Sequence, residues 1–369
     1  MRLWIPGPTE VRPAILAKMA RPMIGHRAPE MGELIERLDP HLAHAFGLEV
    51  DSGATLGVHT ASASGLMEAA LRGVGPRVLC LVSGAFGKRW FKIAQALGKD
   101  VQSLEVPMGE AVSPEDLASA LAGAAHFDAV TLISNETSTG VRTPLAGIAE
   151  VMARHPETQL LVDLVSYIAG GPVEFDRHGI DFGLAGVQKA FALPPGISVV
   201  CASERYLAGA RELNRGSMYL DPVAILDGHT ARKTPSTPAI SLYYALAQQL
   251  EDISGGVTLP ARQRELRGRA AWTARFEKHE RMRQRTESWA ATHGLELLPA
   301  PELRSPTVSC IKSGDLDVPT FLAALEARGQ KVSNGYGDLK NKTLRIGHMG
   351  DHTEDDLERL LSDADDVLG

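Results

Sequence analysis

Short apolar runs alternate with amphipathic stretches from about residue 55 to residue 205. Runs that are apolar throughout are typical of parallel strands whose sheet is covered by helices on both faces. The predicted strands are residues 78–82, 101–106, 129–134, 160–165, 182–185 and 198–202. The helices predicted between them are residues 64–72, 88–97, 115–122 and 145–153. This alternation predicts an α/β fold with a mostly parallel sheet.

A different order of elements follows residue 237. Two helices are predicted at residues 239–253 and at about 259–293, and the second is polar and rich in arginine. The later pattern predicts a small α+β unit with strands 307–311 and 343–346 and helices 318–328 and 354–367. A chain of 369 residues is too long for one modest core. We therefore expect an N-terminal arm (1–14), a large domain (15–250) and a small C-terminal domain (255–369).

Composition narrows the choice of partners and compartment. The net charge of −7 at pH 7 gives no reason to expect a nucleic-acid or anionic-membrane partner. No apolar run approaches the length of a membrane span, and the first residues contain no apolar segment of a secretory signal. Cys80, Cys201 and Cys310 lie in strand-like runs and are expected to be isolated buried thiols. These features predict a cytoplasmic protein.

Two other features invite a nucleic-acid or a metal interpretation, and neither is favoured. In the helix predicted at 259–293 the arginines are interspersed with glutamates, which is typical of a solvated helix face. His41 and His44 stand at helical spacing without further clustered ligands, which is more typical of surface residues than of a metal site. We predict no metal.

A single lysine stands among small and apolar residues in segment 186–196, GVQKAFALPPG. Predicted strands flank this segment, and ligands in such sheets bind beyond the carboxyl ends of the strands. Burial lowers the pKa of an amine, which would make Lys189 the nucleophile that a Schiff base with an aldehyde requires. A lysine after a strand is also commonly a solvated surface residue, so this segment alone leaves both interpretations open.

Two more charged residues lie within apolar strands. Asp163, in LLVDLV, is either a structural partner at the strand end or a carboxylate that faces a pyridinium nitrogen. Arg345, in LRIG, is either paired with a structural carboxylate or placed to bind the carboxylate of a substrate with its planar fork. Small residues in TASASGLME, residues 60–68, open a helix whose N-terminus is suited to a phosphate. Together, the lysine, aspartate, arginine and phosphate loop match pyridoxal phosphate acting on an amino acid.

Nearly the whole chain resembles the class V aminotransferases of fold type I, the group of alanine–glyoxylate and serine–glyoxylate (serine–pyruvate) aminotransferases. The resemblance runs from PGPTEVRPAILAKMARPMIGHRAPEM to LRIGHMG. GVQKAFALPPG is similar to the family's lysine motif, SNETSTG to its N/G-E-x-S-T-G segment and VDLVSYIAG to its V-D-x-V-S-S-x-G-G strand. The resemblance implies a pyridoxal 5'-phosphate enzyme with a large domain of this fold and a smaller C-terminal domain.

The resemblance also implies roles for individual residues. Lys189 would form the Schiff base and shuttle the proton, and Asp163 would pair with the pyridine nitrogen. Arg345 would bind the substrate carboxylate, beside an arm that contains Gly7. The other implied cofactor contacts are Val165 and Phe86 on the ring faces, Thr137 near the phenolic oxygen, and Ser62, Ala63, Ser64 and Gln188 at the phosphate. Thr234 and Ser236 would reach the phosphate of the partner subunit, which implies a homodimer with shared active sites.

Departures from the family pattern bear on substrate preference. Val187 replaces the usual serine before Gln188, Tyr167-Ile168-Ala169 replaces a Ser-Leu-Gly run, and Ser64 stands where some members have glycine or histidine. RIGHMG and TPSTP are similar to archaeal members that use aspartate or phosphoserine. His26 and Arg27 are expected to pair with Glu30 or Glu33, and the alternative is that they favour an anionic substrate.

Three functions remain in competition. The first is transamination of a small amino acid of the alanine or serine class with a 2-oxo acid such as glyoxylate or pyruvate, with an aspartate or phosphoserine transaminase as the alternative. The second is a lyase such as a cysteine desulfurase, which needs a cysteine on the loop at residues 331–338, where none stands. The third is a non-catalytic relative, which the presence of Lys189, Asp163 and Arg345 disfavours.

Overall fold

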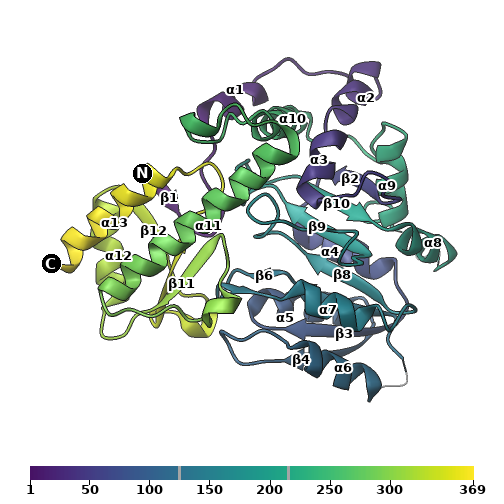
Figure 1. Cartoon of the computed structure of the whole chain (residues 1–369). Helices are drawn as coiled ribbons and strands as arrows, with labels where there is room; N and C mark the ends of the chain where they lie inside the picture. The colour runs from purple at the N-terminus through teal and green to yellow at the C-terminus, as the bar shows by residue number, and fades with distance from the viewer. Residues whose placement is uncertain (124–125, 214–216) are drawn as a thin grey trace.

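The computed structural model describes residues 1–123, 126–213 and 217–369, and two main sheets organise them (Figure 1). Seven strands form the central sheet. In spatial order they are β2 (Thr55–His59), β10 (Ser198–Ala202), β9 (Phe182–Gly186), β8 (Gln159–Asp163), β5 (Ala129–Ile133), β3 (Arg77–Val82) and β4 (Asp100–Glu105). All neighbouring pairs are parallel except those made by β10. The predicted α/β fold with a mostly parallel sheet is confirmed.

Alternation of buried side chains explains why these strands are apolar throughout. In β3, Leu79 and Leu81 belong to one core, whereas Val78, Cys80 and Val82 belong to another. Since successive side chains point to opposite faces, the sheet is buried on both sides. The first core is covered by α1 (Pro13–Met19), α2 (Pro29–Glu36), α3 (Asp39–Phe46), α6 (Pro114–Ala122), α7 (Leu145–Met152) and α10 (Ile240–Ser254). The second is covered by α4 (Ala63–Arg72), α5 (Ala85–Ala96), α8 (Glu204–Leu213) and α9 (Pro222–Thr230).

The four-stranded sheet lies toward the C-terminus of the chain. Its spatial order is β1 (Arg2–Trp4), β12 (Gln330–Asn334), β13 (Thr343–Gly347) and β11 (Val308–Lys312). The core between this sheet and its helices α11 (Gly268–Thr292), α12 (Val318–Ala327) and α13 (Glu354–Leu368) contains Trp4 and Trp289. The first residues of the expected arm thus form an edge strand, parallel to β12. We propose that the two sheets mark the two domains, at 15–250 and 255–369.

Short elements complete the described chain. They are strands β6 (Asn135–Glu136) and β7 (Val141–Arg142) and the 3-10 turns η1 (Ala261–Gln263), η2 (Pro301–Leu303) and η3 (Gly337–Leu339). The expectation of one helix over residues 259–293 was wrong at its start, because α11 begins only at Gly268. Residues 264–266 fold back instead, and the carbonyl oxygen of Leu266 lies 2.7 Å from where a Cβ on Gly256 would stand. Only glycine tolerates this close approach at a φ of +73°.

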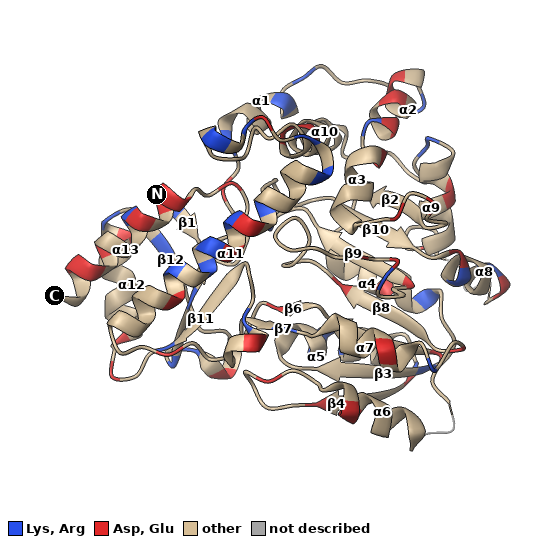
Figure 2. Ribbon diagram, in the orientation of Figure 1, with Lys and Arg blue, Asp and Glu red and all other residues tan. Residues whose placement is uncertain are grey.

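Charged residues of both signs are interspersed along α11 (Figure 2). Arg281 pairs with Glu354, and Arg285 pairs with Glu358, so these α11 arginines bind α13. In the described part of the chain, no three His, Cys, Asp or Glu side chains form a metal cluster, and His41 bonds Ser254. No described helix is both long and apolar enough to cross a bilayer. All three cysteines are buried free thiols, as expected.

A buried ionic network joins the central sheet to the C-terminal elements. Arg275 of α11 is fully buried and donates to the carbonyl oxygens of Ala169 (3.1 Å) and Ala190 (2.6 Å). Its third nitrogen, Nη1, donates to the Asp351 carboxylate at 2.9 Å, and the same carboxylate accepts from Arg12 at 2.6 Å. Burial opposes ionisation of Asp351, but the charges of Arg275 and Arg12 outweigh burial and lower its pKa. Asp351 therefore pairs with two guanidinium groups from distant segments, and Asp252 is a second anionic partner for Arg12.

Replacing Asp351 should destabilise the protein strongly. Asp351→Ala leaves the buried Arg275 without an anion, and removing one partner of a buried pair costs about 3–5 kcal/mol. Urea unfolding followed by circular dichroism measures the change. Glu358→Ala is the matched control, because the Arg285–Glu358 pair is exposed and should contribute less than about 1 kcal/mol. Equal effects of the two substitutions would contradict the role given to the buried network.

Candidate active site

Lys189 lies on the loop between β9 and β10, at the end of the sheet where the parallel strands finish. Its side chain is only 8% exposed, and its amine donates to the carbonyl oxygen of Pro6. Burial lowers the pKa of this amine to about 8, and repulsion from Arg345 adds to the effect. Gly7 packs directly on the side chain, since a Cβ at Gly7 would lie 2.5 Å from Cδ of Lys189. The predicted buried amine and the N-terminal arm are thus in contact.

Asp163 is the last residue of β8, which is the direct neighbour of β9, the strand that precedes Lys189. It is 4% exposed, and its carboxylate accepts from the backbone N–H of Val165 at 2.7 Å. Burial raises the pKa of Asp163 to about 7, while the Val165 N–H and the charge of Lys189 act in the opposite direction. No ion pair within 4.0 Å involves Asp163 among the described residues, so the structural salt bridge considered from the sequence is not found.

The N-terminus of α4 presents the small residues expected at a phosphate. Ser62 is the N-cap and makes no side-chain cap bond, which leaves backbone N–H groups of the first turn for a ligand. Ser64 Oγ accepts from Arg89 of α5 at 2.9 Å. The Arg89 guanidinium carbon also lies 4.8 Å from the centre of the Phe86 ring. Positive charge therefore stands beside the helix terminus, and Arg89 is a residue that sequence reasoning missed.

A buried glutamate organises the segment around Phe86 and Thr137. Glu136 accepts hydrogen bonds from the backbone N–H groups of Phe86 (3.0 Å), Gly87 (3.2 Å) and Ser138 (3.1 Å). Thr137 Oγ1 donates to Ser166 Oγ at 2.8 Å. A carboxylate that receives several N–H groups needs no cation nearby. Sequence reasoning quoted the SNETSTG segment but overlooked Glu136, although an acidic residue in an otherwise small, neutral run was the available signal.

Arg345 reaches the same region from β13. It is 8% exposed, and its guanidinium donates to the carbonyl oxygens of Thr137 and Asn334, each at 3.1 Å. Burial lowers its pKa. In the part of the chain that the structure describes, no carboxylate lies within ion-pair distance of Arg345. The alternative of a structural ion pair is therefore not found, and the guanidinium keeps capacity for an external carboxylate.

Thr234 and Ser236 follow α9 and are placed differently from the other predicted site residues. Thr234 lines a pocket of about 440 Å³ with His26, Arg27, Arg232 and Lys233, and none of the residues around Lys189 lines that pocket. Its Oγ1 is buried without a hydrogen-bond partner. Gln188 packs its side chain against Gly186, and its carbonyl oxygen accepts from Thr9 at 3.0 Å. The structure thus places Gly7, Asp163 and Arg345 near Lys189, and it places Thr234 in a pocket that these residues do not line.

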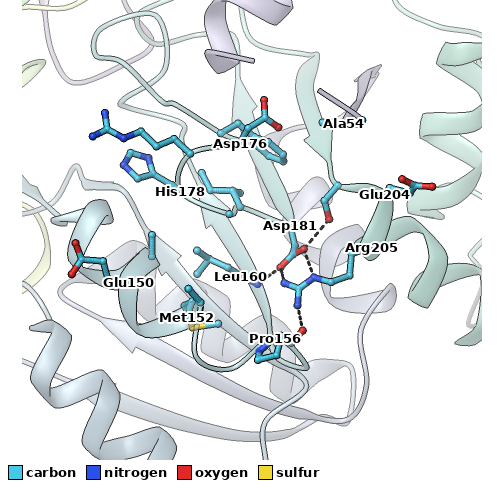
Figure 3. A pocket seen from close by; sticks show the side chains of 18 of the residues that line it. Ala54, Glu150, Met152, Pro156, Leu160, Asp176, His178, Asp181, Glu204 and Arg205 are labelled. Carbon is cyan, nitrogen blue, oxygen red and sulfur yellow. Dashed lines mark hydrogen bonds and ion pairs between the residues drawn. The ribbon is translucent and has the colours of Figure 1, made fainter. Parts of the chain in front are cut away.

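A separate pocket of about 820 Å³ opens at the opposite end of the strands, near the start of β8 (Figure 3). Arg205 and Asp181 point toward each other there, with Nε 3.0 Å from Oδ1. Asp181 also accepts from Ser203 Oγ and from the N–H of Leu160. The buried carboxylate at the centre of this pocket is therefore already paired with groups of the same chain.

The residues at the end of the sheet fit pyridoxal phosphate. The group needs an amine for its aldehyde, a carboxylate for its ring nitrogen and N–H donors for its phosphate. Lys189, Asp163 and the α4 N-terminus supply these in one region, and the carboxylate lacks a cation partner of its own. Phe86 adds an aromatic surface.

Residues 52–360 match the family model described as aminotransferase class-V. The chain belongs to the class V aminotransferases. It is therefore an enzyme that catalyses transamination with pyridoxal phosphate as its cofactor. This membership confirms the family resemblance and excludes the non-catalytic alternative.

Two relatives and one solved structure are similar to this chain over nearly its whole length. The chain is 32% identical to an uncharacterized aminotransferase of Methanocaldococcus jannaschii, over 94% of this chain and 87% of that protein. It is 28% identical to the L-aspartate–glyoxylate aminotransferase of Paracoccus denitrificans, over 95% of this chain and 87% of that protein. The crystal structure of an alanine–glyoxylate aminotransferase from Nostoc sp. superposes with a TM-score of 0.88 at 27% identity, covering 100% and 95% of the two chains.

Replacing Asp163 should change how the stability of the cofactor-free protein depends on pH. A raised pKa means that folding favours protonated Asp163, so its contribution to stability falls as pH rises from about 4 to 7. Asp163→Asn removes this penalty. The variant should match wild type near pH 4 and exceed it by about 2–4 kcal/mol at pH 8.

Urea unfolding of both proteins between pH 4 and pH 8 measures this difference. Asp338→Asn is the control, because Asp338 is exposed on a loop and should leave the pH profile unchanged. If Asp163→Asn were less stable than the wild type at pH 8, the Asp163 carboxylate would have a stabilising partner, and this account of its pKa would be wrong.

Proposed function

We propose that the enzyme transfers the amino group of a small amino acid, of the alanine or serine class, to a 2-oxo acid such as glyoxylate or pyruvate. The observation that carries the proposal is one set of buried groups at the sheet edge. Lys189 is an amine with a lowered pKa, and among the described residues Asp163 has no cation and Arg345 no carboxylate within ion-pair distance. Each lacks the partner that a substrate or cofactor would provide.

In this proposal each residue has a defined task. Pyridoxal phosphate, when bound, supplies an aldehyde for amines and a ring that accepts the electrons of the broken Cα–H bond. Lys189 holds the aldehyde covalently until substrate arrives, and its freed amine then removes and returns the proton of the substrate Cα. Asp163 keeps a proton on the ring nitrogen, and Arg345 orients the substrate carboxylate.

The remaining contacts position the cofactor. Phe86 and Val165 would pack against the ring, and Thr137 would lie near its phenolic oxygen. Ser62, Ala63, Ser64 and Gln188 would hold the phosphate, where the α4 terminus favours negative charge. The Pro6–Pro8 arm, with Gly7 against Lys189, excludes water from the amine.

We further propose a homodimer in which Thr234 and Ser236 reach the phosphate of the partner subunit. Thr234 supports this because its Oγ1 is buried yet has no hydrogen-bond partner within its own chain. A cytoplasmic location remains part of the proposal, supported by three buried cysteines that form no disulfide.

One observation favours a second substrate class, aspartate or phosphoserine. The pocket that Thr234 lines also contains Arg27 and Lys233, and neither cation has an ion pair in the described structure. The expected pairing of Arg27 with Glu30 or Glu33 is not found there. If this pocket faces the partner's site, its charge would attract an anionic side chain. The desulfurase alternative loses support, because Cys310 is buried in β11 and burial raises its pKa to about 11.

A half-reaction assay tests the proposed reaction. We expect alanine or serine, added singly to the loaded enzyme, to shift the cofactor absorbance and yield the corresponding 2-oxo acid in equal amount. Lys189→Ala should fold and lose about 10³-fold or more of this rate, because general-base catalysis by a positioned amine contributes about that much. Aspartate as the only reactive donor would favour the second class, and no reaction with any donor would reject the proposal.

The shared site is tested by measuring cofactor affinity and mass together. Thr234→Val with Ser236→Ala should weaken pyridoxal phosphate binding by about 100-fold, since two hydrogen bonds to a charged group are lost and each is worth about 1.5 kcal/mol. Sedimentation should give a dimer for both proteins. A monomeric wild-type enzyme with full cofactor affinity would rule out the shared site.

A further inference from the structure

Tyr336 is a large aromatic residue that the proposed reaction leaves without a task. It lies on the loop between β12 and β13, and 42% of its surface is exposed. Its ring centre is 5.9 Å from that of Phe86, with an interplanar angle of 31°. The guanidinium carbon of Arg345 lies 5.5 Å from the same ring. One side chain thus touches both the proposed cofactor-stacking ring and the proposed carboxylate-binding group.

The base of this loop is held rigidly. Asn334 donates to Asn341 Oδ1 at 2.6 Å, and the N–H of Asn341 donates back to Asn334 Oδ1 at 2.7 Å. Gly335 leaves no room for a side chain, because the Leu339 carbonyl oxygen would lie 2.0 Å from its Cβ. Arg345 itself donates to the carbonyl oxygen of Asn334. Tyr336 is therefore placed by the same backbone that places Arg345.

The phenol hydroxyl is not what holds the ring. Among the described residues, Tyr336 makes ring contacts but its hydroxyl has no hydrogen bond. An exposed aromatic ring beside a cation lowers the local polarity and is attracted to the cation through its face. The ring therefore shields one side of the Arg345 guanidinium from water.

We propose that Tyr336 is a specificity-determining residue, whose ring forms the outer wall of the substrate site. This inference rests on the proposed function, in which the substrate lies between the Phe86 side of the cofactor and Arg345. The wall strengthens the bond between Arg345 and the substrate carboxylate by excluding water. It also limits the room for the substrate side chain, and so selects small amino acids.

Two variants and one matched control separate the ring from the loop. Tyr336→Phe should behave like wild type within about twofold, because it keeps the ring. Tyr336→Ala should raise the KM for alanine about 5- to 10-fold with little change in kcat, and should reduce the preference for alanine over leucine about 10-fold. Lys340→Ala, an exposed residue of the same loop without side-chain contacts in the described structure, should change neither quantity.

A binding measurement tests the same role of Tyr336 without relying on the reaction. Calorimetric titration of the loaded enzyme with propionate, a carboxylate without an amine, should show binding weakened about 5- to 10-fold in Tyr336→Ala and unchanged in Lys340→Ala. The inference would be overturned if Tyr336→Ala bound propionate as tightly as the wild-type enzyme does. It would also be overturned if Lys340→Ala lost as much affinity as Tyr336→Ala, or if the wild-type enzyme did not bind propionate. Failure of the proposed function is distinct, because it appears as absent transamination by the wild-type enzyme.

Discussion

Burial of one amine is the constraint on which the rest of the site depends. Lys189 lies under the Pro6–Gly7 arm, and burial brings its pKa to about 8 rather than the 10.5 of a solvated lysine. A cation there would be poorly solvated, so the neutral nucleophilic form is within reach near neutral pH. Asp163 is shifted in the opposite sense, to a pKa of about 7, by the same loss of water. In this site, burial therefore disfavours both the ammonium form of Lys189 and the carboxylate form of Asp163, and a bound cofactor would supply partners for both groups.

The position of Lys189 depends on a guanidinium far along the chain. Arg275 binds the carbonyl oxygens of Ala169 and Ala190, on the loops that follow Asp163 and Lys189. Ala169 itself has a φ of +63°, a conformation that costs an alanine of order 1 kcal/mol and needs support from its surroundings. Because Arg275 also pairs with Asp351, it joins both catalytic loops to the segment after β13, which carries Arg345. One buried ion pair thus joins the loops after Asp163 and Lys189 to the segment that follows β13.

Much of this organisation was predictable from the sequence. The strand at 198–202 was placed at its observed bounds, and the one at 78–82 was placed one residue short of the observed start, because continuous apolar runs between turn residues leave little choice. Lys189, Asp163 and Arg345 were singled out because charges within apolar runs need a reason.

What the sequence did not reveal depends on long-range contacts. β1 becomes a strand only because β12 offers a free edge about 330 residues later. Glu136, Arg89 and Tyr336 acquire their roles from neighbours on other elements, and no periodicity records those pairings. The start of α11 was misplaced because a polar, helix-favouring composition continues through residues that fold back on Gly256. Thr234 lines a pocket that none of the residues around Lys189 lines, which a linear motif does not disclose.

The most direct test of the account is reduction of the loaded enzyme with borohydride, followed by mass spectrometry of its peptides. The account predicts one stable pyridoxyl adduct, on the peptide that contains Lys189, and none in Lys189→Ala. An adduct on another lysine, or an unlabelled protein after cofactor has been supplied, would contradict it.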